Sequence, residues 1–423
     1  MDSSRGVRVC YAAYCFDPEK GGGSRMYARY LPGLRERGIS PEIVSGTQKA
    51  AKLGPQDLAS EWTRLPIGAP LPATLLNGTR VRGVRLPDQL GRKRAAVFFR
   101  TLIDDCRNPE SRPDIVNLMM TFSAASLPWV RKLRRLGIPL VYSLTIVPKL
   151  SKSRLKRFIK VQMLRRHFRL MDAIIVMCLY QERWLRQIGI DKPIAIMPNG
   201  VDFARFRPPR DESERLALRN KLGFSADDEV LTTIGAVSPR KGTDLLIEAL
   251  RLVLARRPHA RLVILGLRSD LINPKFAPFR RRLEGLLADP RLAARVRFMG
   301  IVDNPNEYLR ASDIYVFASH RESIPNSIFE AMASGLPTVT APFLGWGEDC
   351  GEAGRHYLLA KHDPESLASA VTSILEDPAL RAALATAGHA WTREFMNPDI
   401  PLDRFAALYQ QLTRAHARTV APR

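Results

Sequence analysis

Short apolar runs alternate with amphipathic stretches along the whole chain. In the first half, runs of strand length and β-type composition lie at 7–11, 41–44, 115–118, 140–144, 173–177 and 194–197. Patterns with helical spacing lie between several of them, at 26–36, 129–136 and 155–170. Strands that alternate with helices are typical of βαβ units, so this half predicts an α/β domain with a parallel sheet.

The second half shows the same alternation. Strands are predicted at 230–235, 261–265, 296–299, 314–317 and 338–340, with helices at 243–257, 277–287, 306–311, 327–334, 364–375 and 402–417. Between the halves, around 202–211, Pro208 and Pro209 can continue neither a helix nor a central strand. The pattern therefore predicts two α/β domains, and 423 residues suffice to bury two cores.

Composition places the chain among globular proteins of the cytoplasm. Hydrophobic residues make up 45% and charged residues 25%, which is typical of a folded chain. The start lacks the features of a secretory signal, and no apolar run approaches the ~20 residues of a spanning helix. The five cysteines are odd in number and scattered, which indicates reduced thiols rather than a disulfide framework.

The positive charge points to a polyanionic partner. The formal net charge is +23, which draws a protein either to nucleic acid or to an anionic membrane surface. No recognisable nucleic-acid-binding module occurs and aromatic residues are only 8%, so nucleic acid is the weaker alternative.

A basic stretch at 149–169 keeps the membrane alternative open. It holds nine Lys or Arg and no acidic residue, while Leu155, Phe158 and Ile159 follow helical spacing. Such a helix either lies on a membrane surface or packs its apolar stripe into the first domain. The sequence leaves open whether the protein is peripheral on the inner face of the membrane.

Two glutamates stand where a ligand of an open α/β sheet would bind. Glu322 follows the strand predicted at 314–317, and Glu330 lies in the helix predicted at 327–334. Ligands bind beyond the carboxyl ends of such strands, where helix N-termini offer N–H groups to a diphosphate. A carboxylate can accept hydrogen bonds from a ribose diol. Alternatively, 327–330 is a capping box, in which Glu330 satisfies a backbone amide.

Two further loops carry candidate phosphate ligands. Gly21, Gly22 and Gly23 would let the backbone approach a phosphate closely, or would simply form a flexible turn. Arg240 and Lys241 precede a predicted helix and can bind phosphate, or can be solvated surface charges.

The arrangement resembles glycosyltransferase family 4, whose E-x7-E motif matches Glu322 and Glu330. Other segments that resemble the family follow in its order over nearly the whole chain: 18–24, 171–176, 194–202, 235–242, 298–300, 311–313 and 330–337. The resemblance implies a GT-B fold, an α/β architecture of two Rossmann-like domains facing across a cleft. The acceptor domain would span 1–205 and the donor domain 206–393, with 394–423 forming a helix that returns to the first domain.

The resemblance also implies a function. The protein would transfer a sugar, with retention of anomeric configuration, from a nucleotide diphosphate sugar to a glycan, lipid-linked or small-molecule acceptor, in the biosynthesis of a cell-surface polysaccharide or glycolipid. Arg240, Lys241 and Glu322 would be catalytic, and basic residues would replace a metal, so no metal or other cofactor is expected. The donor-binding set would be Gly21, Gly22, Gly23, Arg240, Lys241, Glu322, Ser323, Ile324, Pro325, Asn326 and Glu330.

The sequence departs from the family at several positions. Ala236 stands where an Arg is common, and Arg240 is expected to replace it. Thr145, Asn117 and Met119 stand where many relatives carry His, which leaves the acceptor unidentified. A phosphorylase or a nucleotide-sugar epimerase of the same fold remains a rival, although E-x7-E with Pro-Arg-Lys-Gly disfavours both.

Overall fold

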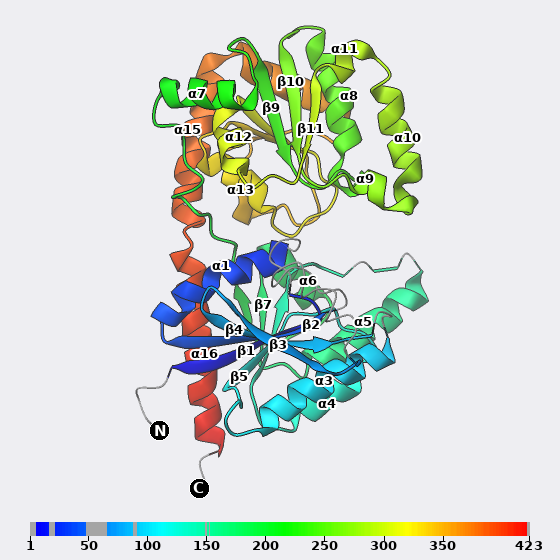
Figure 1. The fold of residues 1–423 in the computed structure, drawn as a ribbon, viewed down its shortest axis with the longest axis vertical. Coiled ribbons are helices and arrows are strands. Elements are labelled where there is room, and N and C mark those ends of the chain that lie inside the picture. Colours follow the sequence, from blue (N-terminus) through cyan, green and yellow to red (C-terminus); the bar gives the residue numbers. More distant parts are fainter. Residues whose placement is uncertain are drawn as a thin grey trace. The chain divides into compact units, whose positions relative to one another are not determined.

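The chain forms two compact units, each with its own sheet (Figure 1). The computed structural model describes residues 6–16, 22–47, 66–87, 91–148, 150–151 and 153–420. One unit comprises Met1–Pro198 and Asp399–Arg423, and the other Asn199–Pro398. The divisions expected from the sequence lay at 205/206 and 393/394.

The first unit is built on an eight-stranded sheet with the order β3-β4-β2-β1-β5-β6-β7-β8. β3 runs antiparallel to β4, and the other neighbours pair in parallel. The strands are β1 (Val7–Ala13), β2 (Ile39–Thr47), β3 (Pro70–Leu76), β4 (Thr79–Arg85), β5 (Ile115–Leu118), β6 (Leu140–Leu144), β7 (Ala173–Val176) and β8 (Ile194–Ile196).

Helices cover both faces of this sheet (Figure 1). Four of them bury apolar side chains in one core: α3 (Arg92–Arg107), α4 (Leu127–Arg134), α5 (Arg154–Phe168) and α6 (Leu179–Gln187). The other face is covered by α1 (Gly22–Glu36) and by α16 (Asp399–Val420), which contacts α1, β1 and β5.

A buried polar network fixes α16 to the sheet. Asn117 Nδ2 on β5 donates to Tyr409 Oη on α16 at 2.8 Å, and Ser143 Oγ donates to Asn117 Oδ1 at 2.9 Å. Tyr27 Oη on α1 lies 2.6 Å from Ser143 Oγ. At the start of α16, Asp399 and Asp403 pair with Arg37. The final helix is thus part of the first unit, although it follows the second unit in sequence.

The second unit has a six-stranded sheet, parallel throughout, with the order β11-β10-β9-β12-β13-β14. Its strands are β9 (Glu229–Ile234), β10 (Ala260–Leu265), β11 (Val296–Gly300), β12 (Ile314–Phe317), β13 (Thr338–Thr340) and β14 (Leu358–Leu359). The chain runs outwards from β9 to β11 and then from β12 to β14 on the other side. The strand order therefore reverses between β9 and β12.

Alternating side chains of these strands bury against helices on both faces. Leu231, Leu262 and Val316 face a core that includes α8 (Thr243–Leu254), α10 (Ala277–Leu286) and α14 (Pro364–Glu376). Val230 and Tyr315 face the opposite side. That side carries α7 (Glu212–Leu222), α12 (Pro305–Ala311) and α13 (Asn326–Ala333). The remaining helices of this unit are α9 (Ser269–Ile272), α11 (Pro290–Ala293) and α15 (Pro378–Phe395).

The polar network predicts a measurable cost for losing one hydroxyl. Tyr409→Phe leaves the buried amide of Asn117 without its acceptor, so we expect the free energy of unfolding to fall by about 1–3 kcal/mol. Urea unfolding measures this change. Tyr14→Phe, which removes a hydroxyl from a half-buried site in the same unit, is the control and should cost less than about 0.5 kcal/mol. Equal stability of both variants would show that the network does not hold α16.

Candidate functional site

The loop after β9 brings two cations to the carboxyl edge of the second sheet. Gly235 follows the strand, and Pro239–Lys241 form a 3-10 turn that carries Arg240 and Lys241. Gly242 then adopts φ 64°, a left-handed conformation, and α8 begins. A Cβ on Gly242 would lie 2.2 Å from the Ala318 backbone oxygen, so the turn packs directly on the loop after β12. Only glycine fits both constraints.

The loop after β12 places a carboxylate between those cations. Lys241 Nζ lies 2.9 Å from Glu322 Oε1, and Arg240 NH1 donates to the same oxygen. Arg240 NH1 also donates to the Arg321 backbone oxygen at 2.9 Å. The three side chains meet where the strand order reverses between β9 and β12. In open α/β sheets that reversal is the usual position of a ligand site.

Burial and pairing set the charge states of this cluster. The side chains of Lys241 and Glu322 are 16% and 13% exposed, against 48% for Arg240. Burial lowers the pKa of Lys241, and its pairing with Glu322 only partly offsets this. Burial acts to raise the pKa of Glu322, but Lys241 and Arg240 outweigh it and the pKa falls below its usual value. The carboxylate therefore stays ionised to a more acidic pH than an exposed glutamate.

Ser319 links the two loops and was not anticipated from the sequence. Its hydroxyl is fully buried, 2.9 Å from Glu322 Oε1 and 3.0 Å from the Arg240 backbone oxygen. His362 Nε2 lies 3.2 Å from the Ser319 backbone oxygen, and its ring stacks on His320 at 4.5 Å between centroids. No sequence motif identifies Ser319 or His362, because their contact joins two loops that are far apart in the sequence. Ser319 follows β12, and His362 follows β14.

The predicted donor-binding segment continues from Glu322 into α13. Ser323 is buried, and Pro325 is the N-cap residue of a helix that begins at Asn326. Asn199 Nδ2 donates to Asn326 Oδ1, which joins the 194–202 segment to this helix start. The capping-box alternative for 327–330 fails. Ser327 lies inside the helix, and the N-cap makes no side-chain hydrogen bond.

Two glycines shape this segment. Gly335 adopts φ 75° directly after α13, which confirms the predicted left-handed helix end. Gly345, in the loop after β13, has φ 113°, and a Cβ there would lie 2.4 Å from the Glu322 backbone oxygen. Leu344 forms an isolated bridge with Arg321 beside it. The loop after β13 therefore supports the backbone that presents Glu322.

The structure brings some of the predicted site residues into contact and leaves others apart. Arg240, Lys241 and Glu322 form one ion-paired cluster. Glu330 is half-buried in the second turn of α13, and Ile324 is half-buried in the loop before it. Gly22 and Gly23 form the start of α1 in the first unit, whereas Gly21 lies outside the described residues.

The three acceptor-side positions at which this sequence departs from the family lie in different surroundings. Asn117 is fully buried in the network with Tyr409, so it cannot face a ligand. Thr145 is exposed at the end of β6, and Met119 is half-buried after β5. In the first sheet the strand order reverses between β1 and β5, which places Met119 beside that reversal.

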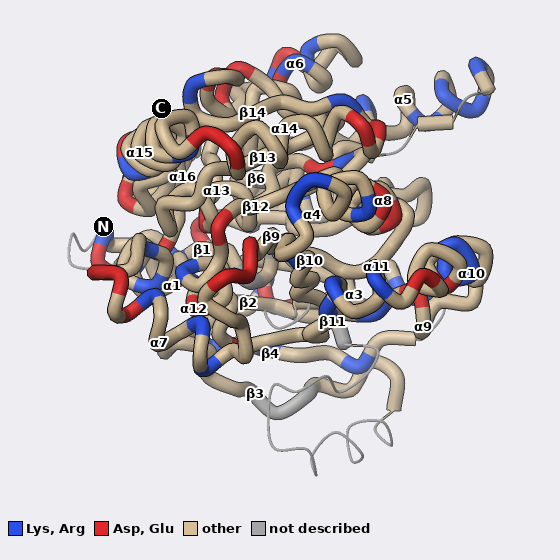
Figure 2. The backbone as a smooth tube through the Cα atoms, turned by 90° about the horizontal axis from the view of Figure 1, so that it is seen from above, with Lys and Arg blue, Asp and Glu red and all other residues tan. Residues whose placement is uncertain are grey.

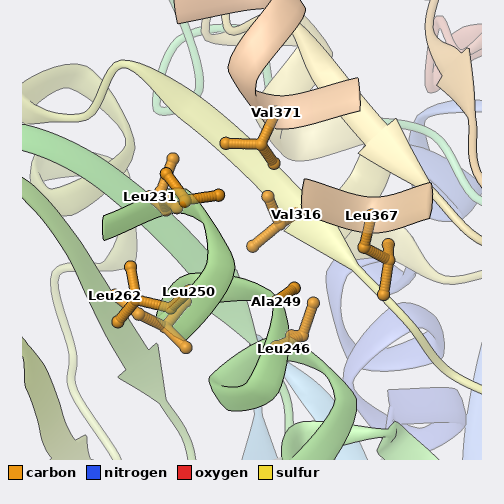
Figure 3. A pocket seen from close by; sticks show the side chains of 9 residues that line it. Leu231, Leu246, Ala249, Leu250, Leu262, Val316, Leu367 and Val371 are labelled. Carbon is orange, nitrogen blue, oxygen red and sulfur yellow. The ribbon is translucent and has the colours of Figure 1, made fainter. Parts of the chain in front are cut away.

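A cavity inside the second unit is not a ligand site. It lies between the sheet and helices α8 and α14, and Leu231, Leu246, Val316, Leu367 and Val371 are among its lining residues (Figure 3). All of its lining side chains are apolar and part of the core. It offers no group that could orient a polar substrate. In the described part of the chain, no group of three or more His, Cys, Asp or Glu could hold a metal ion.

Comparison with known proteins gives consistent matches for both units. Residues 214–391 match the family model for glycosyl transferases group 1, and residues 20–205 match that for glycosyltransferase family 4. The lipopolysaccharide core biosynthesis mannosyltransferase LpsB of Rhizobium meliloti is 27% identical over 79% of this chain and 89% of its own. The D-inositol 3-phosphate glycosyltransferase of Kineococcus radiotolerans is 35% identical, but the match spans only 45% of this chain and 46% of the relative.

A solved structure shows the same fold over nearly the whole chain. The sucrose-phosphate synthase of Thermosynechococcus elongatus superposes with a TM-score of 0.74 and 20% identity, covering 97% of this chain and 100% of that one. The likeness confirms the predicted GT-B fold class.

The tight turn at Gly242 predicts that alanine substitutions at two different glycines will have opposite effects on stability. Gly242→Ala puts a methyl group at a left-handed position against the Ala318 oxygen, so we expect a loss of at least about 2 kcal/mol. Gly285→Ala is the matched control, since Gly285 is exposed in α10 with open space at its Cβ. It should stabilise the protein by about 0.5–1 kcal/mol. Thermal unfolding compares the two, and a tolerated Gly242→Ala would contradict the observed turn.

Proposed function

Because this chain belongs to glycosyltransferase family 4, we propose that it transfers a sugar from a nucleoside diphosphate sugar to a saccharide of a cell-envelope glycan or glycolipid. The observation that carries this proposal is the meeting of Arg240, Lys241 and Glu322 at the strand reversal of the second sheet. Two cations at that point match a ligand with two adjacent phosphates.

Three of the predicted donor residues, together with the start of α13, have chemical roles in this proposal. Arg240 and Lys241 bind the diphosphate and stabilise the negative charge that develops on it as the sugar leaves. The N-terminus of α13 adds backbone N–H groups, and the Glu330 carboxylate accepts hydrogen bonds from the ribose diol. In this scheme the side-chain cations do the work that a divalent metal does in other phosphate-binding sites, so the reaction needs no metal.

We propose that the acceptor is attached to lipid, or lies close to a membrane. One relative is named for lipopolysaccharide core biosynthesis, and a lipopolysaccharide contains a lipid part. No helix in the described part of the chain combines the length and apolar character needed to cross a bilayer. Access to a lipid-borne acceptor would then depend on a docking surface.

The first two turns of α5 have the chemistry of such a surface. Leu155, Phe158 and Ile159 are 68%, 60% and 58% exposed, so the apolar stripe does not pack into the core. Burial in α5 begins only near its end, at Leu164 and Phe168. Figure 2 shows blue Lys and Arg positions on α5 with no acidic position among them. Exposed apolar side chains among cations fit an anionic lipid surface.

Removing the Glu330 carboxylate should weaken donor binding. Glu330→Ala loses hydrogen bonds to a charged group, worth roughly 1.5–3 kcal/mol, so the donor dissociation constant should rise about tenfold or more. Calorimetric titration with UDP-glucose and GDP-mannose in EDTA measures it. Glu376→Ala, a partly exposed carboxylate on α14, is the control. Unchanged affinity of Glu330→Ala would remove Glu330 from the donor site.

The transfer should retain the configuration of the anomeric carbon. In the proposed site the acceptor attacks from the face that the diphosphate leaves, while Arg240 and Lys241 stabilise the leaving group. Proton NMR of the first product formed from an α-linked nucleotide sugar should show an α-anomer. A β-anomer formed before any mutarotation would contradict this mechanism.

Binding to anionic vesicles should depend on the exposed part of α5. Each Lys or Arg near an anionic leaflet contributes about 1 kcal/mol, so replacing four of them with Gln should abolish co-sedimentation at low salt. The residues are Arg154, Lys156, Arg157 and Lys160. Arg165 is left unchanged, since its guanidinium donates to the Ile188 backbone oxygen and is part of the fold.

A charge-matched variant makes this test specific. Four exposed arginines of the second unit become Gln in it: Arg256, Arg281, Arg291 and Arg355. It should still sediment with anionic vesicles, because it keeps the surface of α5. Equal sedimentation of both variants, or wild-type protein that ignores anionic lipid, would show that α5 is not the docking surface.

A further inference from the structure

The two cations of the proposed donor site are paired with one of the site's own side chains. Glu322 Oε1 accepts hydrogen bonds from three groups: Lys241 Nζ at 2.9 Å, Arg240 NH1, and the Ser319 hydroxyl at 2.9 Å. We propose that Glu322 is an internal competitor of the donor diphosphate. In the free protein its carboxylate occupies the two cations, and a nucleoside diphosphate must displace it from them. The inference rests on the proposed function and adds a step to it.

The surroundings of Lys241 restrict how a ligand can reach its ammonium. Its ammonium lies 5.0 Å from the centroid of the Phe317 ring, and the adjacent methylene groups lie against Gly235, where a Cβ would be 3.0 Å from Cε. With Glu322 on a further side, the side chain is only 16% exposed. A phosphate oxygen that takes the position of Glu322 Oε1 would meet Lys241 Nζ at hydrogen-bond distance.

Electrostatics explain why the free protein keeps this arrangement. A buried ammonium without a counter-ion is strongly unfavourable, so Glu322 stabilises Lys241 until a ligand arrives. Arg240, at 48% exposed, is open to an incoming anion and can exchange its partner first. A diphosphate carries more negative charge than one carboxylate and offers more acceptor oxygens, so it can replace Glu322 at both cations.

The same exchange would act in reverse after transfer. Once displaced, the Glu322 carboxylate is available to accept hydrogen bonds from hydroxyl groups of the donor sugar. When the sugar has left, only the nucleoside diphosphate keeps Glu322 away from Lys241 and Arg240. Return of the carboxylate then weakens the hold on the product. Ser319, buried beside both loops, defines the position to which Glu322 returns.

The sign of one affinity change tests the proposal. Glu322→Gln keeps the shape of the side chain but removes the competing charge, so we expect UDP and GDP to bind about tenfold more tightly than to wild-type protein. Isothermal titration with each sugar-free nucleotide measures this. Transfer by the same variant should be slower, because its product leaves more slowly. Glu376→Gln, which removes one carboxylate from the same unit, should leave both affinities unchanged.

Two further variants separate failure of this inference from failure of the proposed function. Lys241→Gln should lose nucleotide affinity. If it does, and Glu322→Gln binds UDP and GDP equally or more weakly than wild type, the competitor role is wrong while the donor site stands. Glu322→Ala must change affinity in the same direction as Glu322→Gln. If neither nucleotide binds to wild-type protein or to any variant, the proposed donor site is wrong and the inference falls with it.

Discussion

Two cations stand side by side at the strand reversal of the second sheet, and the other groups of the site are arranged around them. Arg240 and Lys241 can stand there only because Gly242 turns in the left-handed region against the Ala318 oxygen. Their mutual repulsion and the burial of Lys241 then require an anion nearby. Glu322 supplies it from the loop after the neighbouring strand, held by Ser319. The backbone turn, the charge pairing and the position of the carboxylate thus form one unit.

The parallel sheets explain why this unit arises where it does. All six strands of the second sheet run in the same direction, so the loops after β9, β12 and β13 meet at one edge. The first unit has its own reversal between β1 and β5, and α16 closes its opposite face through Tyr409. Residues distant in sequence are brought to each edge by strand order alone.

Much of this architecture could be predicted from the sequence. The strands of both sheets other than β3, β4 and β14 follow predicted apolar runs, and the E-x7-E spacing located Glu322 and Glu330 in one segment after β12. The hairpin of β3 and β4 was missed, since its segments alternate weakly and lie beside a basic stretch. Ser319 and His362 could not be found, because their contact depends on how two separate loops pack.

Helical spacing in the sequence also could not show whether an apolar stripe faces the core or the solvent. Leu155, Phe158 and Ile159 show the same helical pattern whether they pack on a core or face solvent, and only the fold shows them exposed. The reverse holds for Asn117. Because many relatives carry a His at this position, the sequence indicated a changed acceptor site. In the structure the side chain is buried and donates a hydrogen bond to Tyr409. In both cases burial, which depends on the tertiary structure, decided the role of the residue.

We propose that side-chain cations alone neutralise the leaving diphosphate in this site. The most direct test is the initial rate at which the purified protein releases nucleoside diphosphate from its nucleotide sugar, compared in excess EDTA and in added magnesium or manganese. We expect equal rates in both conditions, and loss of the rate in Lys241→Gln under each. A rate abolished by EDTA and restored by a divalent metal would contradict it.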